Sequence, residues 1–177
     1  MRRRKLRHRK LLRRRLPERP MESLMERKPE KTALMQATDL LARQEQSEQR
    51  LREKLQRRGY EEEEVRSALD YLKERHYLDD REACERQFRF LYEESRSSVK
   101  QICVKLMQRG FDSSLVKECV PRDIFEREKA AALKCLGLKF RKPQDTRKMM
   151  QFLYQKGFDG SALRAAVEEF EESFRSE

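Results

Sequence analysis

The residues best suited to bind an anion are four cations that stand directly before three repeated glycines. They are Arg57 and Arg58 before Gly59, Arg109 before Gly110, and Lys156 before Gly157. Arginine and lysine can bind phosphate or carboxylate groups. They can equally complement the negative C-terminal end of a helix. The sequence leaves two roles open: a local helix cap, and a periodic basic row that binds acidic protein surfaces or DNA phosphates.

Residue types that support catalysis or metal binding are sparse and widely spaced. The four cysteines and two histidines are Cys84, Cys103, Cys119, Cys135, His8 and His76. A zinc site needs closely grouped thiolates or imidazoles, and the sequence has neither a CxxC nor an HExxH pattern. The phosphate-binding pattern GxxxxGK[ST] and the nucleophile pattern GxSxG are also missing. We therefore expect no catalytic residue, no metal and no cofactor, and we predict that the cysteines are small apolar core residues.

The three glycines belong to one pattern that the sequence repeats. It reads KLQRRGY at 54–60, KLMQRGF at 105–111 and FLYQKGF at 152–158. A leucine precedes each glycine by four residues and an aromatic residue follows it, and these two positions touch when a helix ends in a Schellman turn. Glycine adopts the required left-handed backbone without the strain that a Cβ atom adds. The pattern predicts that Gly59, Gly110 and Gly157 are structural helix stops.

Apolar spacing around each glycine predicts helices on both sides of the stop. Apolar residues recur eight and four positions before the glycine, and six and ten positions after it. These spacings place them on one face of each helix. A further helix precedes the two helices that flank each glycine. Every copy therefore reads helix, helix, glycine stop, helix. The predicted N-caps of these helices are Asp79, Ser98, Asp112, Asp123 and Asp159.

We therefore expect an all-α fold of three tandem three-helix repeats that form an elongated, curved array, preceded by a basic tail. The expected boundaries are 1–31 for the tail and 32–78, 79–121 and 122–177 for the three helical repeats. A unit of this size has little interior of its own, so the repeats are expected to share a core.

Nearly all of the net charge lies near the N-terminus. The chain has 43 Lys and Arg against 32 Asp and Glu, a formal charge of +11, and residues 1–36 hold 14 of these cations against four Glu. The candidate phosphate-binding tail consists of Arg2, Arg3, Arg4, Lys5, Arg7, Arg9, Lys10, Arg13, Arg14 and Arg15. Three interpretations stay open: a solvated disordered arm, an arm that orders on DNA or RNA, and a membrane-surface helix or transit peptide. No run approaches the length of a membrane span, and we expect a monomer in the cytoplasm without membrane association.

Residues 40–80 resemble the first module of the RecX family, the bacterial regulatory proteins that act on the RecA recombinase. The resemblance rests on LLAR at 40–43, Ser47 before a second helix, Gly59 with Tyr60, and LDD at 78–80. The later KLMQRGF and QKGF fit the second and third modules, so the resemblance covers about residues 34–170. The chain departs from the family pattern with REAC at 81–84, with a glycine-free turn ESRSSVKQ, and with Arg50 in place of a glutamate.

The resemblance implies a protein that is not an enzyme and binds in the groove of the RecA–single-stranded DNA filament. There it would inhibit RecA and so affect recombination, DNA repair and the SOS response, contacting single-stranded DNA indirectly or through the tail. Two other function classes stay open from the residues alone. One is a helical-repeat adaptor for another protein, and the other is a direct nucleic-acid-binding protein that acts through its basic tail.

Overall fold

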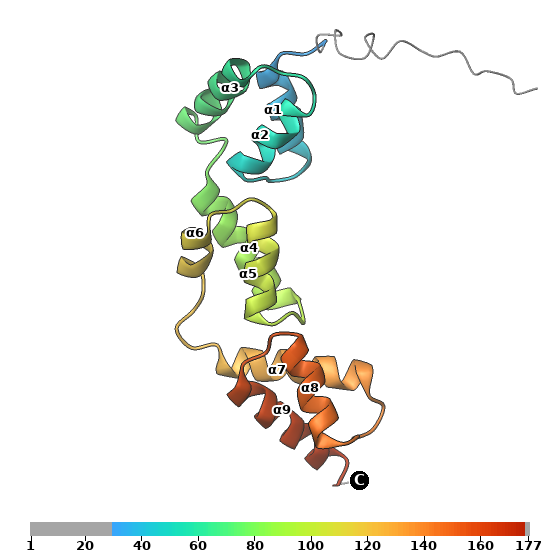
Figure 1. Cartoon of the computed structure of the whole chain (residues 1–177). Helices are drawn as coiled ribbons and strands as arrows, with labels where there is room; N and C mark the ends of the chain where they lie inside the picture. The colour runs from blue at the N-terminus through green and yellow to red at the C-terminus, as the bar shows by residue number, and fades with distance from the viewer. Residues whose placement is uncertain (1–29, 176–177) are drawn as a thin grey trace, which may run out of the picture.

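Helices alone form the regular secondary structure of residues 30–175, the part of the chain that the computed structural model describes (Figure 1). Within that range the nine helices are α1 (Ala33–Arg43), α2 (Glu48–Gln56), α3 (Glu62–Glu74), α4 (Asp80–Glu94), α5 (Val99–Gln108), α6 (Ser113–Glu118), α7 (Phe125–Lys139), α8 (Thr146–Gln155) and α9 (Gly160–Ser173). The prediction of an all-α chain is confirmed. No helix among these residues is long and apolar enough to cross a lipid bilayer.

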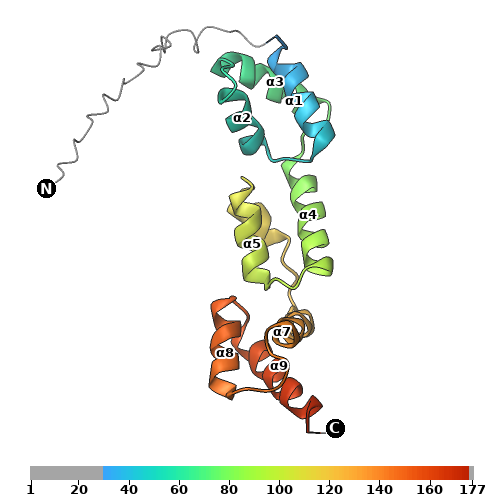
Figure 2. The same cartoon turned by 90° about the vertical axis from the view of Figure 1, so that its right-hand side faces the viewer.

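The helices form three bundles in chain order, which we call module 1 (α1–α3), module 2 (α4–α6) and module 3 (α7–α9). Extensive helix–helix contacts occur inside each module, with α1 on α3, α4 on α5 and α7 on α9 as the largest pairs. The modules follow one another in a gently curved row, as the two views show (Figures 1 and 2). The expected tandem array of three-helix repeats is confirmed.

Each module has its own apolar core, so the expectation of a shared core is wrong. The buried side chains of module 1 cluster around Leu51, Leu55 and Leu69. Ile102 and its neighbours form a second cluster in module 2, and Met149 and its neighbours form a third in module 3. Three helices that pack on one another suffice to bury the apolar faces of such short helices. The bonds that join one module to the next are largely hydrogen bonds.

Gly59, Gly110 and Gly157 each end the middle helix of a module with a left-handed backbone, at φ of +83°, +87° and +77°. The amide of each glycine donates to the carbonyl three residues earlier, at 2.9, 2.9 and 2.8 Å. The amide of the following aromatic residue donates to the carbonyl of the leucine five residues earlier, at 3.3–3.4 Å. These two bonds define a Schellman turn, and the aromatic ring is buried against the same leucine's module core.

Side-chain caps start most of the helices. Ser98, Asp112 and Asp159 cap α5, α6 and α9 as predicted, and Asp79 caps α4. The predicted cap of α7 is wrong by one residue, because Ile124 occupies the N-cap position and offers no side-chain acceptor. Helix α7 continues past Gly137 to Lys139, and Gly137 has no left-handed backbone.

Replacing Gly110 by alanine should destabilise the protein more than replacing Gly59. Both alanines would adopt a left-handed backbone at a cost of about 1–2 kcal/mol. A Cβ atom at Gly110 would also lie 2.6 Å from Ser47 Oγ, whereas one at Gly59 meets nothing within 4 Å. Urea-induced unfolding of the two variants measures the difference. Equal losses of stability would show that the close approach of Ser47 Oγ to Gly110 adds nothing to the cost of the alanine.

A candidate partner-binding surface at the module junctions

The middle helices of the three modules lie end to end in what we call the central column, α2, α5 and α8 (Figure 2). Ser47, the N-cap of α2, donates its hydroxyl to the carbonyl of Arg109 at the end of α5, at 2.6 Å. Ser98, the N-cap of α5, donates in the same way to the carbonyl of Lys156 at the end of α8, at 2.7 Å. The same bond therefore joins module 1 to module 2 and module 2 to module 3.

Each junction serine has two hydrogen-bonding roles. Its oxygen accepts from an amide in the first turn of its own helix, Arg50 N for Ser47 and Gln101 N for Ser98, both at 3.2 Å. Its hydrogen goes to the carbonyl of the next module. A hydroxyl is the side-chain group that can accept and donate through one atom, which aspartate cannot do when ionised. Both serines have no exposed surface, so the two bonds satisfy groups that water cannot reach.

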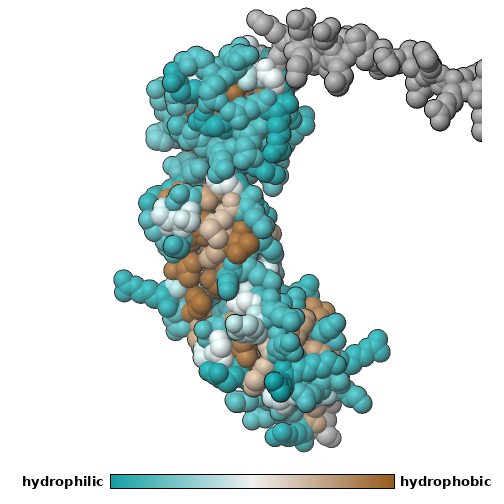
Figure 3. Space-filling view, viewed as in Figure 1, coloured by the Kyte–Doolittle hydropathy of each residue, from teal (hydrophilic) through white to brown (hydrophobic). Residues whose placement is uncertain are grey.

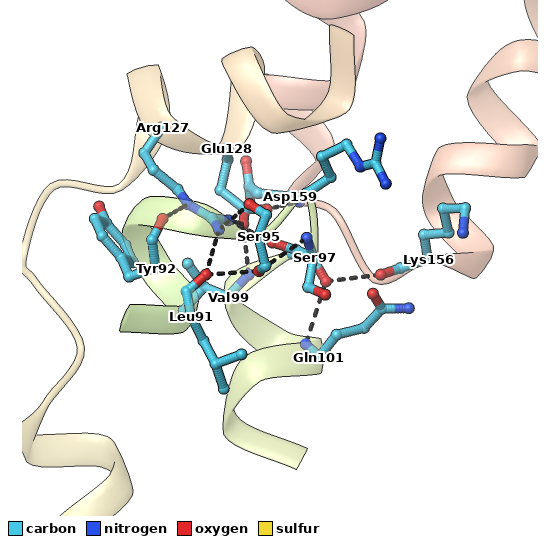
Figure 4. Close-up of polar contacts among 12 residues, drawn as sticks. Leu91, Tyr92, Ser95, Ser97, Val99, Gln101, Arg127, Glu128, Lys156 and Asp159 are labelled. Atoms are coloured by element: carbon cyan, nitrogen blue, oxygen red, sulfur yellow. Dashed lines mark hydrogen bonds and ion pairs between the residues drawn. The ribbon is translucent and has the colours of Figure 1, made fainter. Parts of the chain in front are cut away.

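A carboxylate from the following module also caps each upper helix. Asp80 Oδ1 accepts from Glu48 N at 2.8 Å at the first junction. At the second junction Glu128 Oε1 accepts from Val99 N at 2.6 Å (Figure 4). Carboxylates are stabilising at a helix N-terminus because its free amides carry partial positive charge. Burial raises the pKa of Asp80, and its bond from the Glu48 amide opposes that rise.

Arg127 ties module 3 to the turn between α4 and α5 (Figure 4). Its guanidinium donates to the carbonyls of Tyr92 and Ser95, at 2.9 and 3.1 Å, and to that of Ser97. The same group lies 4.9 Å from the centre of the Tyr92 ring. The carbonyls at the end of α4 have no partners inside their helix, and the planar fork of an arginine satisfies several of them at once. At the first junction Arg86 forms an ion pair with Glu45 instead.

Two of the four cations that the sequence singled out lie at the free end of the central column. Arg58 donates to the carbonyl of Lys54 at 3.0 Å, which is the helix-capping role. Arg57 is 3.6 Å from the carboxylate of Glu53 and largely exposed. Among residues 30–175 no module meets this end of α2, and the Arg58 side chain bonds a carbonyl four residues earlier in its own helix.

The other two cations lie at the junctions and do not cap their own helices. Arg109 donates to Gln87 Oε1 at 2.7 Å. The Lys156 ammonium lies 5.2 Å from the centre of the Phe152 ring. Their carbonyls are bonded to Ser47 and Ser98, the Arg109 side chain is exposed, and the Lys156 side chain is half-buried. Binding of a partner by any of the four cations stays a prediction.

Each junction leaves a cleft beside the central column. The first-junction cleft, of about 180 Å³, is lined by the α1–α2 loop, α2, α4 and α5 and includes Arg109. The second-junction cleft, of about 710 Å³, is lined by the α4–α5 loop, α5, α7 and α8 and includes Lys156. The two clefts occupy equivalent places in the repeat. They are the candidate partner-binding surface of the described residues.

Several of these features carry no sequence signal or lie outside the described residues. The outward bonds of Ser47 and Ser98 were not predicted, although Ser98 was predicted as an N-cap and Ser47 was placed before a second helix. The buried roles of Arg127 and Glu128 were missed too, because a charged pair in a charged helix looks like a solvated face. The predicted phosphate-binding tail, Arg2 to Arg15, lies outside residues 30–175.

The cysteines of module 2 belong to its apolar core. Cys84 is fully buried, as predicted, and the other three cysteines are half-buried. Cys84 Sγ lies 3.7 Å from Cys119 Sγ, and burial raises the pKa of the Cys84 thiol to about 12. A neutral thiol is a poor nucleophile and metal ligand. Residues 30–175 contain no group of three or more His, Cys, Asp or Glu side chains that could hold a metal ion.

Ser98→Ala should destabilise the chain about twice as much as Thr32→Ala. Both residues are N-caps that accept from a first-turn amide at 3.2 Å, a bond worth about 1 kcal/mol. Ser98 also donates to Lys156 O, and a second hydrogen bond adds about 1 kcal/mol. Urea unfolding of both variants checks this. Equal losses would mean that the junction bond adds nothing beyond the cap.

Comparison with known proteins identifies the repeat. Residues 33–72 match the family model described as RecX, first three-helix domain. Regulatory protein RecX of Neisseria meningitidis is 31% identical over 145 residues, 79% of this chain and 92% of that protein. Regulatory protein RecX of Vibrio vulnificus is 28% identical over 74% of this chain and 88% of its own length. The crystal structure of RecX from Lactobacillus salivarius shares the fold, with a TM-score of 0.65 at 18% identity over 79% of this chain and 95% of that one. Because the match to the Neisseria protein spans nearly all of that relative at 31% identity, this chain belongs to the RecX family.

Proposed function

We propose that this chain regulates the RecA recombinase by binding in the RecA–single-stranded DNA filament and inhibiting it. The regulation would take place in the cytoplasm, by a monomer, and would affect recombination, DNA repair and the SOS response. The observation that carries the proposal is a curved row of three modules with equivalent clefts at both junctions, in a chain of the RecX family. A filament also repeats along its axis, so equivalent sites along a row suit it better than a single deep pocket does.

The length of the row supports contacts with more than one filament subunit. In this proposal the repeats 32–78, 79–121 and 122–177 each engage the filament. Contacts made by linked units add through effective concentration, so each of them can be weak. The polar junctions hold the units in order without a large apolar interface between them.

The surface chemistry of the row supports a protein partner. Apolar side chains gather on one face of modules 2 and 3, while the same face of module 1 is mostly hydrophilic (Figure 3). The exposed apolar residues of the central column are Val104 and Met107 on α5 and Tyr154 on α8. Exposed apolar surface of this kind marks interaction sites on soluble proteins. Basic residues at the junctions can add electrostatic steering toward an acidic partner.

The mode of action that fits these features is occupancy of a site, without a chemical reaction. The clefts contain lysine, arginine, glutamine and serine side chains, and no described nucleophile is paired with a base there. A bound row would obstruct the addition of RecA subunits and the changes that accompany ATP hydrolysis.

Purified chain added to RecA and single-stranded DNA should lower the rate of ATP hydrolysis in a dose-dependent way. A coupled ATPase assay measures this, with single-strand binding of the chain alone recorded in parallel. An unchanged RecA rate together with DNA affinity would favour the direct nucleic-acid binder. An unchanged rate without DNA affinity would favour an adaptor for a different protein.

Reversing the charges of Arg57, Arg58, Arg109 and Lys156 to glutamate should weaken RecA inhibition by about tenfold or more, because four favourable long-range contacts become repulsive. The matched control reverses the charges of four other exposed residues, Arg66, Lys117, Arg122 and Arg164. Both variants carry the same net charge, so only position differs. Equal inhibition by the two variants would remove these four residues from the partner surface.

Deleting residues 1–29 should reduce the salt dependence of single-strand binding, since each phosphate contact that is lost lowers the slope of log affinity against log salt by roughly 0.7 for a single strand. Titrations at several salt concentrations measure both slopes. An unaltered slope would exclude the tail as a phosphate-binding arm. RecA inhibition by the shortened chain then shows whether the three modules act without it.

A further inference from the structure

The second-junction cleft holds basic groups that no described carboxylate neutralises. Arg96 enters it from the α4–α5 loop, Lys134 and Lys139 from α7, and Lys156 from the end of α8. None of these four forms an ion pair with another residue of the 30–175 range, whereas many surface cations elsewhere do. Glu94 at the rim is the one carboxylate in the lining, and it is bonded to none of them. The cleft therefore carries a local excess of positive charge.

The equivalent first-junction cleft differs because its cations are satisfied within the chain. Arg50 pairs with Glu53 at 3.4 Å, and the Lys54 ammonium donates to the side-chain oxygen of Gln46. Arg109 donates to Gln87. The two clefts arise from the same repeat, so the difference lies in the residues and not in the fold. In the second cleft, by contrast, no hydrogen bond or ion pair to a residue of the 30–175 range engages the four side-chain cations.

Apolar groups form part of the wall beside these cations. Leu138 is 66% exposed, and the half-buried Cys135 and Phe152 lie in the same lining. The Phe152 and Phe140 rings form a T-shaped pair with centroids 5.6 Å apart, and the Lys156 ammonium lies 5.2 Å from the Phe152 centroid. Single-stranded nucleic acids bind through free aromatic faces on which bases stack. This wall offers an aliphatic side chain and a ring that is already covered, so it suits an apolar side chain better than a base.

We propose that the second-junction cleft binds an acidic peptide segment of a partner protein, with carboxylates on the four cations and one large apolar side chain against Leu138. This proposal deepens the proposed function. It rests on that function only for the identity of the partner protein to which the acidic segment belongs. Its chemistry comes from the charge and the wall of the cleft.

The ligand would contact both modules that meet at this junction. Arg96 belongs to module 2, whereas Lys134, Lys139 and Lys156 belong to module 3. The thiol of Cys135 donates to the carbonyl of Arg96 at 3.3 Å, so the two sides of the cleft touch at its floor. A bound acidic segment would therefore bridge the modules and add to the Ser98 bond that joins them.

The experiment measures fluorescence anisotropy of a fluorescein-labelled peptide in which one leucine is flanked on both sides by aspartate and glutamate. The full chain is compared with Lys134→Glu/Lys139→Glu and with Arg50→Glu/Lys54→Glu in the first-junction cleft. Arg164→Glu/Lys117→Glu is the control outside both clefts. The tail is present in every chain, so differences among these equally charged variants report the clefts. We expect the first variant alone to bind about tenfold more weakly or worse, with unchanged thermal unfolding because both lysines are exposed.

The apolar contact is tested by replacing the peptide's leucine with serine and, separately, by Leu138→Ser. Each change should weaken binding several-fold, and together they should weaken it no more than either alone, because both remove the same contact. An oligothymidylate of equal charge serves as the nucleic-acid probe and should bind more weakly to the cleft, with no loss in Lys134→Glu/Lys139→Glu.

Three results would overturn the inference: no measurable peptide binding, equal losses in all three charge variants, or an oligothymidylate affinity that falls in the cleft variant more than the peptide affinity does. The RecA assay is read separately on the same proteins. Peptide binding at the cleft with no inhibition of RecA by the unaltered chain would contradict the proposed function and leave the cleft as an acidic-peptide site. RecA inhibition with no peptide binding would contradict the acidic-peptide site in the cleft and leave the proposed function standing.

Discussion

The structure depends on one hydrogen bond that occurs twice, from a buried serine hydroxyl to the last carbonyl of a helix in the next module. Ser47 and Ser98 form it at 2.6 and 2.7 Å. It is possible because a left-handed glycine follows each accepting carbonyl and has no Cβ atom to hold the two helix ends apart. The partial positive end of one helix thereby faces the partial negative end of the next. Aligned in this way, α2, α5 and α8 form a column, and the remaining helices of the array pack beside it.

Directional polar bonds between modules with small separate cores set how the modules are placed relative to one another. Each module buries its own leucines and aromatic residues, so little apolar surface is left to drive one module onto another. The relative placement of modules then depends on a few bonds with strict geometry: the serine, a carboxylate such as Glu128, and an arginine such as Arg127. Such a junction leaves grooves beside the column, since no large side chains are needed to fill the space between bundles. The clefts are thus a by-product of how the modules are joined.

The sequence predicted the features that depend on neighbours along the chain. Leucine, glycine and aromatic residues within six positions of one another define each helix stop, and helix propensity and capping residues place most helices. It did not predict the junctions, because Ser98 and its acceptor are 58 residues apart in the chain. It also missed His76, which ends α3 at φ of 56° without being a glycine. For the candidate site, sequence gave Arg109 and Lys156 as basic residues near helix ends, but the clefts that include them arise only when two modules meet.

The residue at the N-cap also differs between the two junctions and the first turn of α8. At the upper end of the column a Cβ atom at Gly59 would meet nothing of residues 30–175 within 4 Å, and the Arg58 side chain donates to the carbonyl of Lys54, four residues earlier. At the lower end the N-cap of α8 is Asp145, which accepts from the amide of Lys148. An ionised aspartate has no hydrogen to donate, so it cannot bond the last carbonyl of another helix as Ser47 and Ser98 do. Serine therefore stands at the two N-caps that join described modules and aspartate at the N-cap of α8, and the difference is a single hydroxyl hydrogen.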